Sequence, residues 1–199
     1  TPSTNRASSR TAWSDGITAR IAPGFSRTAA SAATAMAGAV LNGKLYVLGG
    51  LSETGTHPLA TVESYDPKSD AWTTEAPMPT ARMAGGDAAL GETLYAAGGN
   101  VSADELNATV EAFTPGTGWT TKAPLPGVRG NIFIAAFEGR LYVAGGNTQN
   151  GDEKTLFVYD PAANSWSSLA PLPTGRYAGS AAQFLRGKLH IVGGWTARP

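Results

Sequence analysis

The sequence contains no cysteine and two histidines, and both shortages narrow the chemistry open to it. Without cysteine, a disulfide framework, a thiolate metal site and a cysteine nucleophile are all excluded. His57 and His190 stand in no His-x-His or His-Glu-x-x-His spacing, and no Gly-x-Ser-x-Gly motif marks a serine nucleophile. We therefore expect no catalytic residues, no metal site and no other cofactor.

Charge is scarce as well. Lys+Arg and Asp+Glu number 15 each, so the formal net charge is zero, and charged residues make up 15% of the chain. Broad binding to nucleic acid or to an anionic membrane needs clustered excess Lys and Arg, so neither partner is expected. No segment approaches the roughly 18 apolar residues of a membrane helix, which argues against membrane insertion. The compartment stays open, with an extracellular location favoured over a cytoplasmic one, and the Ala-, Gly- and Thr-rich composition indicates a bacterial source.

What the sequence does contain is a repeat. A double glycine closes an apolar run four times, at spacings of 49, 47 and 48 residues. A tryptophan recurs at intervals of 47 residues, and an arginine recurs at the same interval. The repeated residues are Gly49-Gly50, Gly98-Gly99, Gly145-Gly146 and Gly193-Gly194, then Trp72, Trp119 and Trp166, then Arg82, Arg129 and Arg176. Several residue types locked to one period indicate a repeat architecture.

Each repeat predicts four short strands. The first strand is rich in Ala and Gly, at residues 84–90, 131–137 and 178–185. The second is apolar and ends at the double glycine, the third alternates and ends at an Asp-Pro or Thr-Pro turn, and the fourth carries the tryptophan. Small residues in the first strand and a bulky one in the last fit sheets fanned around an axis, with the first strand innermost, as in a β-propeller.

The spacing Gly-Gly…Tyr…Trp…Pro…Arg resembles the kelch repeat over residues 34–194. The resemblance implies an all-β, kelch-type β-propeller of about three and a half to four blades, each with four antiparallel strands. The expected repeats are 34–80, 81–127 and 128–174, with a partial copy at 175–199. Residues 1–30 are expected to be an N-terminal tail or to supply clasp strands, for which Trp13 is the candidate. An open ring would favour self-association through its unpaired strand edges.

The kelch resemblance also bears on catalysis. The family includes copper radical oxidases similar to galactose oxidase, which need a Tyr–Cys cross-link that a chain without cysteine cannot form. The chain therefore resembles the non-enzymatic branch, and we expect a binding or scaffold module that presents its inter-strand loops to a protein or carbohydrate ligand. The alternative is an accessory or partial propeller domain of a larger secreted enzyme.

Candidate binding residues lie in the loops that follow the double glycines. Asn100 and Asn147 begin two of these loops and offer hydrogen-bond donors and acceptors, while Trp195 offers a stacking surface. His57 lies in the first loop, although a solvated loop residue is the simpler interpretation, just as His190 is interpreted as a packed strand residue. Asparagine could also follow Gly-Gly simply because it tolerates left-handed turns.

The repeated arginines are interpreted as structural residues that bond strand ends between blades. In kelch adaptors that this pattern resembles, an arginine two positions further on helps to form a pocket for acidic peptides. Ala84, Asn131 and Ala178 occupy those positions here. This departure argues against an acidic-peptide pocket and adds Asn131 to the candidate binding residues.

Overall fold

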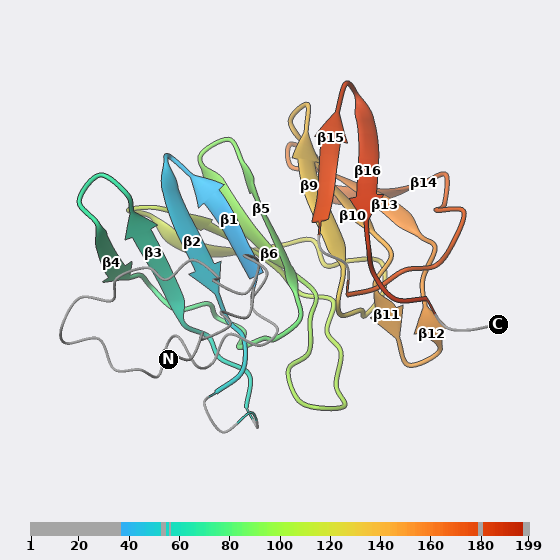
Figure 1. Ribbon diagram of the computed structural model, residues 1–199, viewed down its shortest axis with the longest axis horizontal. Helices are drawn as coiled ribbons and strands as arrows, with labels where there is room; N and C mark the ends of the chain where they lie inside the picture. The colour runs from blue at the N-terminus through green and yellow to red at the C-terminus, as the bar shows by residue number, and fades with distance from the viewer. Residues whose placement is uncertain (1–36, 53–54, 56, 179–180, 197–199) are drawn as a thin grey trace, which may run out of the picture.

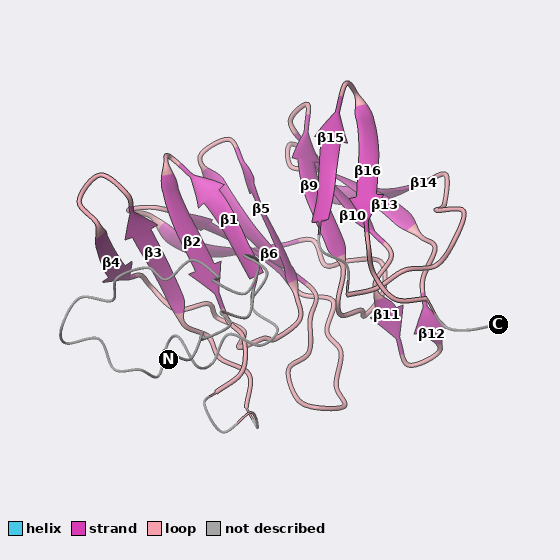
Figure 2. Cartoon of the chain, in the orientation of Figure 1, coloured by secondary structure: helices cyan, strands magenta, loops and turns pink. Residues whose placement is uncertain are grey.

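The structure, a computed structural model, describes residues 37–196 except 53–54, 56 and 179–180. All regular elements in this part of the chain are β-strands (Figure 2), so it holds no helix that could cross a membrane. Three four-stranded antiparallel sheets are followed by a two-stranded one, and we number them blades 1 to 4 (Figure 1). The predicted all-β propeller of about three and a half to four blades is confirmed. Trp13 and the predicted tail or clasp at 1–30 lie outside the described residues.

Strands follow chain order within every blade. Blade 1 contains β1 (Ala37–Leu41), β2 (Lys44–Leu48), β3 (Val62–Asp66) and β4 (Ala71–Thr74). Blade 2 contains β5 (Gly86–Leu90), β6 (Thr93–Ala97), β7 (Val110–Thr114) and β8 (Gly118–Lys122). Blade 3 contains β9 (Phe133–Phe137), β10 (Arg140–Ala144), β13 (Leu156–Asp160) and β14 (Ser165–Leu169), and a small ribbon of β11 (Asn147–Thr148) and β12 (Gly151–Asp152) leaves its second strand. Blade 4 contains β15 (Ala181–Leu185) and β16 (Lys188–Val192).

The first strand of each blade lies innermost, as its small residues predict. β5 contacts β1 on one side and β9 on the other, and β9 also contacts β15. These strands start two or three residues later than predicted, because Ala84, Asn131 and Ala178 take left-handed backbone angles with φ of 52°, 52° and 51°. A left-handed residue cannot continue a strand, so each inner strand begins only after it.

The core lies between successive blades. One cluster packs blade 1 against blade 2, with Tyr46 and Val62 facing Leu94 and Phe113. A second cluster packs blade 2 against blade 3 and includes Tyr95, Val110, Leu141, Val143 and Tyr159. Burial of apolar area between sheets therefore supplies the main stabilisation of the arc, at about 25 cal/mol per Å².

The repeated tryptophans tie neighbouring repeats together at the outer strands. Trp119 packs on Phe113 of the adjacent strand, and its indole Nε1 donates to the Ala76 carbonyl of the preceding repeat at 2.9 Å. Trp166 makes the same bond to the Ala123 carbonyl, also at 2.9 Å. A half-buried aromatic ring with a satisfied N–H explains why the repeat keeps tryptophan at positions 119 and 166.

Candidate ligand-binding face

The loops that follow the double glycines lie at one end of the blades, opposite the short β-hairpin turns (Figure 1). In blades 2, 3 and 4, the residue after the double glycine pairs with the backbone just before the inner strand of the same blade. Asn100 pairs with Met83, Asn147 with Gly130, and Trp195 with Tyr177. We call this end the loop face and define it by Asn100, Asn131, Asn147 and Trp195. The pairings fix where each of its loops begins.

In blades 1 to 3 the double glycine is required because the segment leading to the next blade approaches it closely. Gly145 has φ of 58°, and a Cβ on it would lie 2.4 Å from the Arg176 carbonyl oxygen. Gly146 then donates its backbone N–H to that same carbonyl at 2.8 Å. Only glycine combines a left-handed angle with so close a contact. The motif thus sets the spacing between blades and, with it, the position of each loop.

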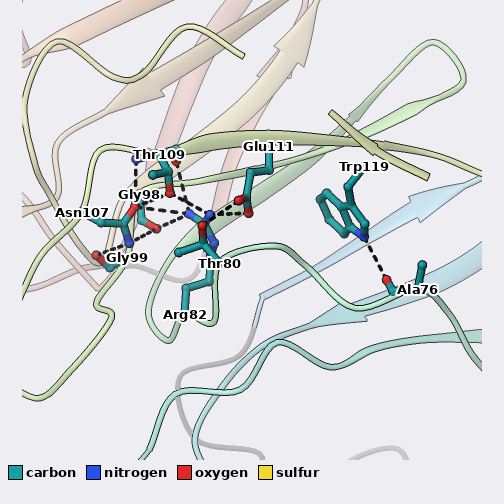
Figure 3. Close-up of polar contacts among 9 residues, drawn as sticks. All are labelled: Ala76, Thr80, Arg82, Gly98, Gly99, Asn107, Thr109, Glu111 and Trp119. Atoms are coloured by element: carbon teal, nitrogen blue, oxygen red, sulfur yellow. Dashed lines mark hydrogen bonds and ion pairs between the residues drawn. The ribbon is translucent and has the colours of Figure 1, made fainter. Parts of the chain in front are cut away.

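The guanidinium of Arg82 is buried in blade 2 (Figure 3). It forms an ion pair with Glu111 at 2.7 Å and donates to the Gly98 carbonyl at 2.6 Å. Thr80 donates to the other oxygen of Glu111 at 2.6 Å, while Asn107 donates to the Gly98 carbonyl at 3.0 Å. Burial lowers the pKa of Arg82, and the charge of Glu111 partly offsets that effect. The backbone carbonyl of Arg82 accepts a bond from blade 1, so the residue links two blades.

The other two repeated arginines reach the equivalent carbonyls. Arg129 donates to Gly145 at 3.3 Å, and Arg176 donates to Gly193 at 3.1 Å. The Cζ atom of Arg129 lies 4.7 Å from the centre of the Phe157 ring, whereas the guanidinium of Arg82 is paired with the carboxylate of Glu111. Burial lowers the pKa of Arg129 too, and Glu153 partly offsets it. These side chains point into the blades, and their contacts support the structural role proposed for them.

Two of the predicted binding residues contact each other directly. The Asn131 side chain donates to the side-chain oxygen of Asn147 at 2.8 Å. Asn100 lies beside them, since a Cβ on Gly130 would come 2.6 Å from its side-chain oxygen. Asn131 also accepts a backbone bond from Ala178, the neighbour of the residue that pairs with Trp195. The structure therefore brings the four loop-face residues into one connected arc.

The two histidines lie apart from this arc, whereas Trp195 belongs to it. His57 is exposed in the loop of blade 1, where Ser52 donates to its carbonyl at 2.8 Å and closes the turn. Trp195 is 69% exposed and is one of the large exposed apolar side chains of the described chain. His190 lies on β16 and pairs with Gln183, so it is a strand residue of blade 4.

A charged residue that the repeat analysis missed lies at the axis of the arc. Asp87 on β5 lines a cavity of about 310 Å³ between the inner strands. Burial raises the pKa of this carboxyl to about 7. An alignment of the inner strands would have singled out Asp87, because the positions equivalent to it in the other blades hold the uncharged residues Gly38, Ile134 and Ala182. No group of three potential metal ligands occurs among the described residues.

Comparison with known proteins agrees with this architecture. The family model described as "Kelch motif" matches residues 32–79 and 129–173. No curated protein matches the sequence. Among the solved structures that match is the structure of YjhT, with a TM-score of 0.70 and 19% sequence identity over 80% of this chain. The matched region is 58% of the YjhT chain, so the present chain spans little more than half of that protein.

The kelch motif and the repeated blades support a binding or scaffold module in general terms. Kelch motifs match in both blade 1 and blade 3, and blade 2 between them has the same strand order. Two segments of this chain, residues 32–79 and 129–173, therefore match the kelch motif, and the chain as described has the repeated blades of a β-propeller.

Proposed function

We propose that this chain is a non-catalytic binding module that presents its loop face to a protein or carbohydrate ligand. The observation that carries the proposal is the gathering of Asn100, Asn131, Asn147 and Trp195 from three blades at one end of the arc. Residues that are 16 to 95 positions apart in the chain would then act on one ligand.

The chemistry of these groups favours a carbohydrate over a protein. The bond from Asn131 to Asn147 uses one donor and one acceptor, and each amide has further hydrogen-bonding capacity. Amides that donate and accept side by side match the paired hydroxyls of a sugar ring. The exposed indole of Trp195 adds a flat apolar surface on which such a ring can stack.

The backbone supports this function by holding the loop face in place. Asn147 and Gly130 exchange two backbone bonds, of 2.9 and 3.1 Å, and Asn100 and Met83 exchange two, of 2.8 and 3.0 Å. A site ordered before binding loses less conformational entropy when the ligand arrives. The rigid blades thus act as the scaffold, and the asparagine amides provide the specificity.

The test is a binding screen of the chain against a glycan array and a displayed peptide library. Variants N131A/N147A and W195A should lose retention of the ligand by about tenfold or more, the effect of about 1.4 kcal/mol. Alanine is tolerated at position 131 because Ala84 and Ala178 hold the same left-handed angle. The matched control is N42G in the hairpin turn between β1 and β2, at the other end of blade 1.

The two arms of the screen distinguish the ligand classes. Retention by glycans that depends on the loop face supports the carbohydrate ligand, and retention by peptides that depends on it supports the protein ligand. The proposal is overturned if neither library is retained, or if the loop-face variants bind as well as N42G does.

A further inference from the structure

Blade 4 contains two strands in the described part of the chain, whereas blades 1 to 3 contain four each (Figure 1). In those three blades the second strand pairs on both of its edges, with the first strand and with the third. Among the described strands β16 pairs with β15 alone, so its other edge carries backbone N–H and C=O groups that a further strand could pair with. Val192 on β16 is 60% exposed, while the residues at the same register in the other blades, Leu48, Ala97 and Ala144, are buried.

The double glycine of blade 4 also has a donor that the other blades use. In blades 1 to 3, the first glycine of the pair donates its backbone N–H to the residue just before the third strand. The acceptors are the carbonyls of Thr61, Thr109 and Thr155, at 2.9, 3.0 and 2.9 Å. The equivalent donor in blade 4 is the N–H of Gly193, which bonds to no acceptor among the described residues. A threonine carbonyl at the start of an added strand would accept this bond.

The repeated arginine of blade 4 has the same unused capacity. In blade 2, Arg82 donates to the hydroxyl of Thr109 at 2.8 Å and pairs with Glu111 on the third strand at 2.7 Å. Arg129 also donates to the threonine that precedes the third strand of its blade. Arg176 is half-buried and donates to one backbone carbonyl of its own blade, at 3.1 Å, and no described carboxylate forms an ion pair with it. Its remaining N–H groups would suit a threonine hydroxyl and a glutamate on an added strand.

A tyrosine of blade 3 marks where an aromatic side chain of the added strand would lie. Tyr46 of blade 1 packs on Phe113 from the third strand of blade 2, with ring centres 6.3 Å apart. Tyr95 of blade 2 packs in the same way on Tyr159 of blade 3, at 6.0 Å. Both of these second-strand tyrosines are buried. Tyr142 holds the equivalent position in blade 3 and is half-buried. An aromatic residue four positions after the threonine would cover its ring.

We propose that blade 4 binds an extended segment of a partner protein, which adds to β16 as an antiparallel third strand with the pattern Thr-aliphatic-Glu-x-aromatic. Residues 109–113 (TVEAF) define this pattern, because they make all four of these contacts in blade 2. The sequence contains the pattern twice, at residues 61–65 and 109–113, and both copies already belong to blades 1 and 2. A second copy of the chain would have to open a blade to offer one, which favours a different protein as the occupant. The edge of β16 is separate from the loop face, and this inference does not depend on the proposed function.

Calorimetric titration of the chain with a synthetic peptide of residues 108–116 tests the proposal. The peptide should bind, and a scrambled peptide of the same composition should not. Glu111→Gln in the peptide and R176M in the chain should each weaken binding about fivefold, the effect of one partly exposed ion pair. Both changes together should weaken it little more than either one does, because they remove the same contact. The matched control is R186N, which removes the same charge from the turn between β15 and β16 and suits the left-handed angle there.

Amide hydrogen exchange of the wild-type chain provides a second measurement, which does not require a variant to fold. With saturating peptide, the N–H of Gly193 should exchange about tenfold more slowly or slower still. The reason is that a peptide carbonyl would accept from it, as the Thr109 carbonyl accepts from the equivalent glycine of blade 2. The exposed turn residues Asn42 and Gly43 of blade 1 serve as the internal control and should exchange at an unchanged rate.

The outcomes separate this site from the loop face and a partner protein from a second copy. The loop-face variant N131A/N147A should bind the peptide as the wild type does, so either proposal can fail without the other. The strand-addition site is overturned if the peptide does not bind at millimolar concentration, if the scrambled peptide binds equally well, or if the exchange of Gly193 does not change. Light scattering that shows a dimer without peptide, together with slow exchange along β16, would also overturn it, because a second copy would then occupy the edge.

Discussion

The buried carboxyl of Asp87 makes the stability of the unliganded chain depend on pH. In the folded chain burial raises the pKa of this carboxyl to about 7, whereas its ordinary pKa is 3.8. Between these values the unfolded chain binds fewer protons than the folded chain does. The free energy of unfolding therefore falls as the pH rises, by about 1.4 kcal/mol per pH unit for this one group.

The size of this effect on the free energy of unfolding follows from the difference between the two pKa values of Asp87. The stabilising contribution is fully present below about pH 4 and is lost by about pH 7, for a total of about 4 kcal/mol. The variant D87N lacks the titration and keeps the shape of the side chain. Between about pH 4.5 and 7.5, the free energy of unfolding of D87N should therefore rise by about 3 kcal/mol relative to that of the wild type.

Urea unfolding of both proteins at several pH values measures this difference directly. Every other titrating group is common to the two chains, so their contributions cancel in the subtraction. A difference that stays constant across the range would refute the reasoning, because it would place the folded-state pKa of Asp87 near its ordinary value. A difference of the opposite sign would mean that a cation of the chain stabilises the carboxylate.

Three further substitutions test the contacts between repeats. Glu111→Ala should lower the free energy of unfolding by about 3–5 kcal/mol because it leaves Arg82 charged and buried. A double variant with both residues made apolar should lower it by less than the sum of the two single changes. Strictly additive losses in urea unfolding would contradict the buried pair. Gly145→Ala should lower the free energy of unfolding by about 3 kcal/mol. Gly139→Ala should lower it by only about 1 kcal/mol, because Gly139 has a left-handed angle but open space around it. Equal melting temperatures of the two variants would contradict the clash at Gly145. Trp119→Phe should cost about 1–2 kcal/mol through its lost hydrogen bond, and an unchanged denaturation midpoint would disprove that contribution.

Because the sequence repeats, most of the fold could be predicted from the residues alone. A local pattern that recurs every 47 residues or so must make the same strands and turns each time, because each copy meets similar neighbours. The order of strands, the number of blades and the innermost position of the small residues followed from that rule. The starts of the inner strands did not, because alanine at positions 84 and 178 carries no sign of its left-handed angle.

The candidate sites depend on departures from the repeat, and only the tertiary structure gives those departures their meaning. By itself the sequence predicts a chain of blades that resemble kelch repeats, and it shows that cysteine and excess charge are lacking. It does not show that Asn131 meets Asn147, or that Glu111 balances Arg82 while a phenylalanine ring faces Arg129. It also does not show that Asp87 lines the space between the inner strands, or that its Oδ2 is buried without a hydrogen-bond partner among the described residues. These relations join residues from different strands and blades, and their distances are set by how the sheets pack rather than by spacing along the chain.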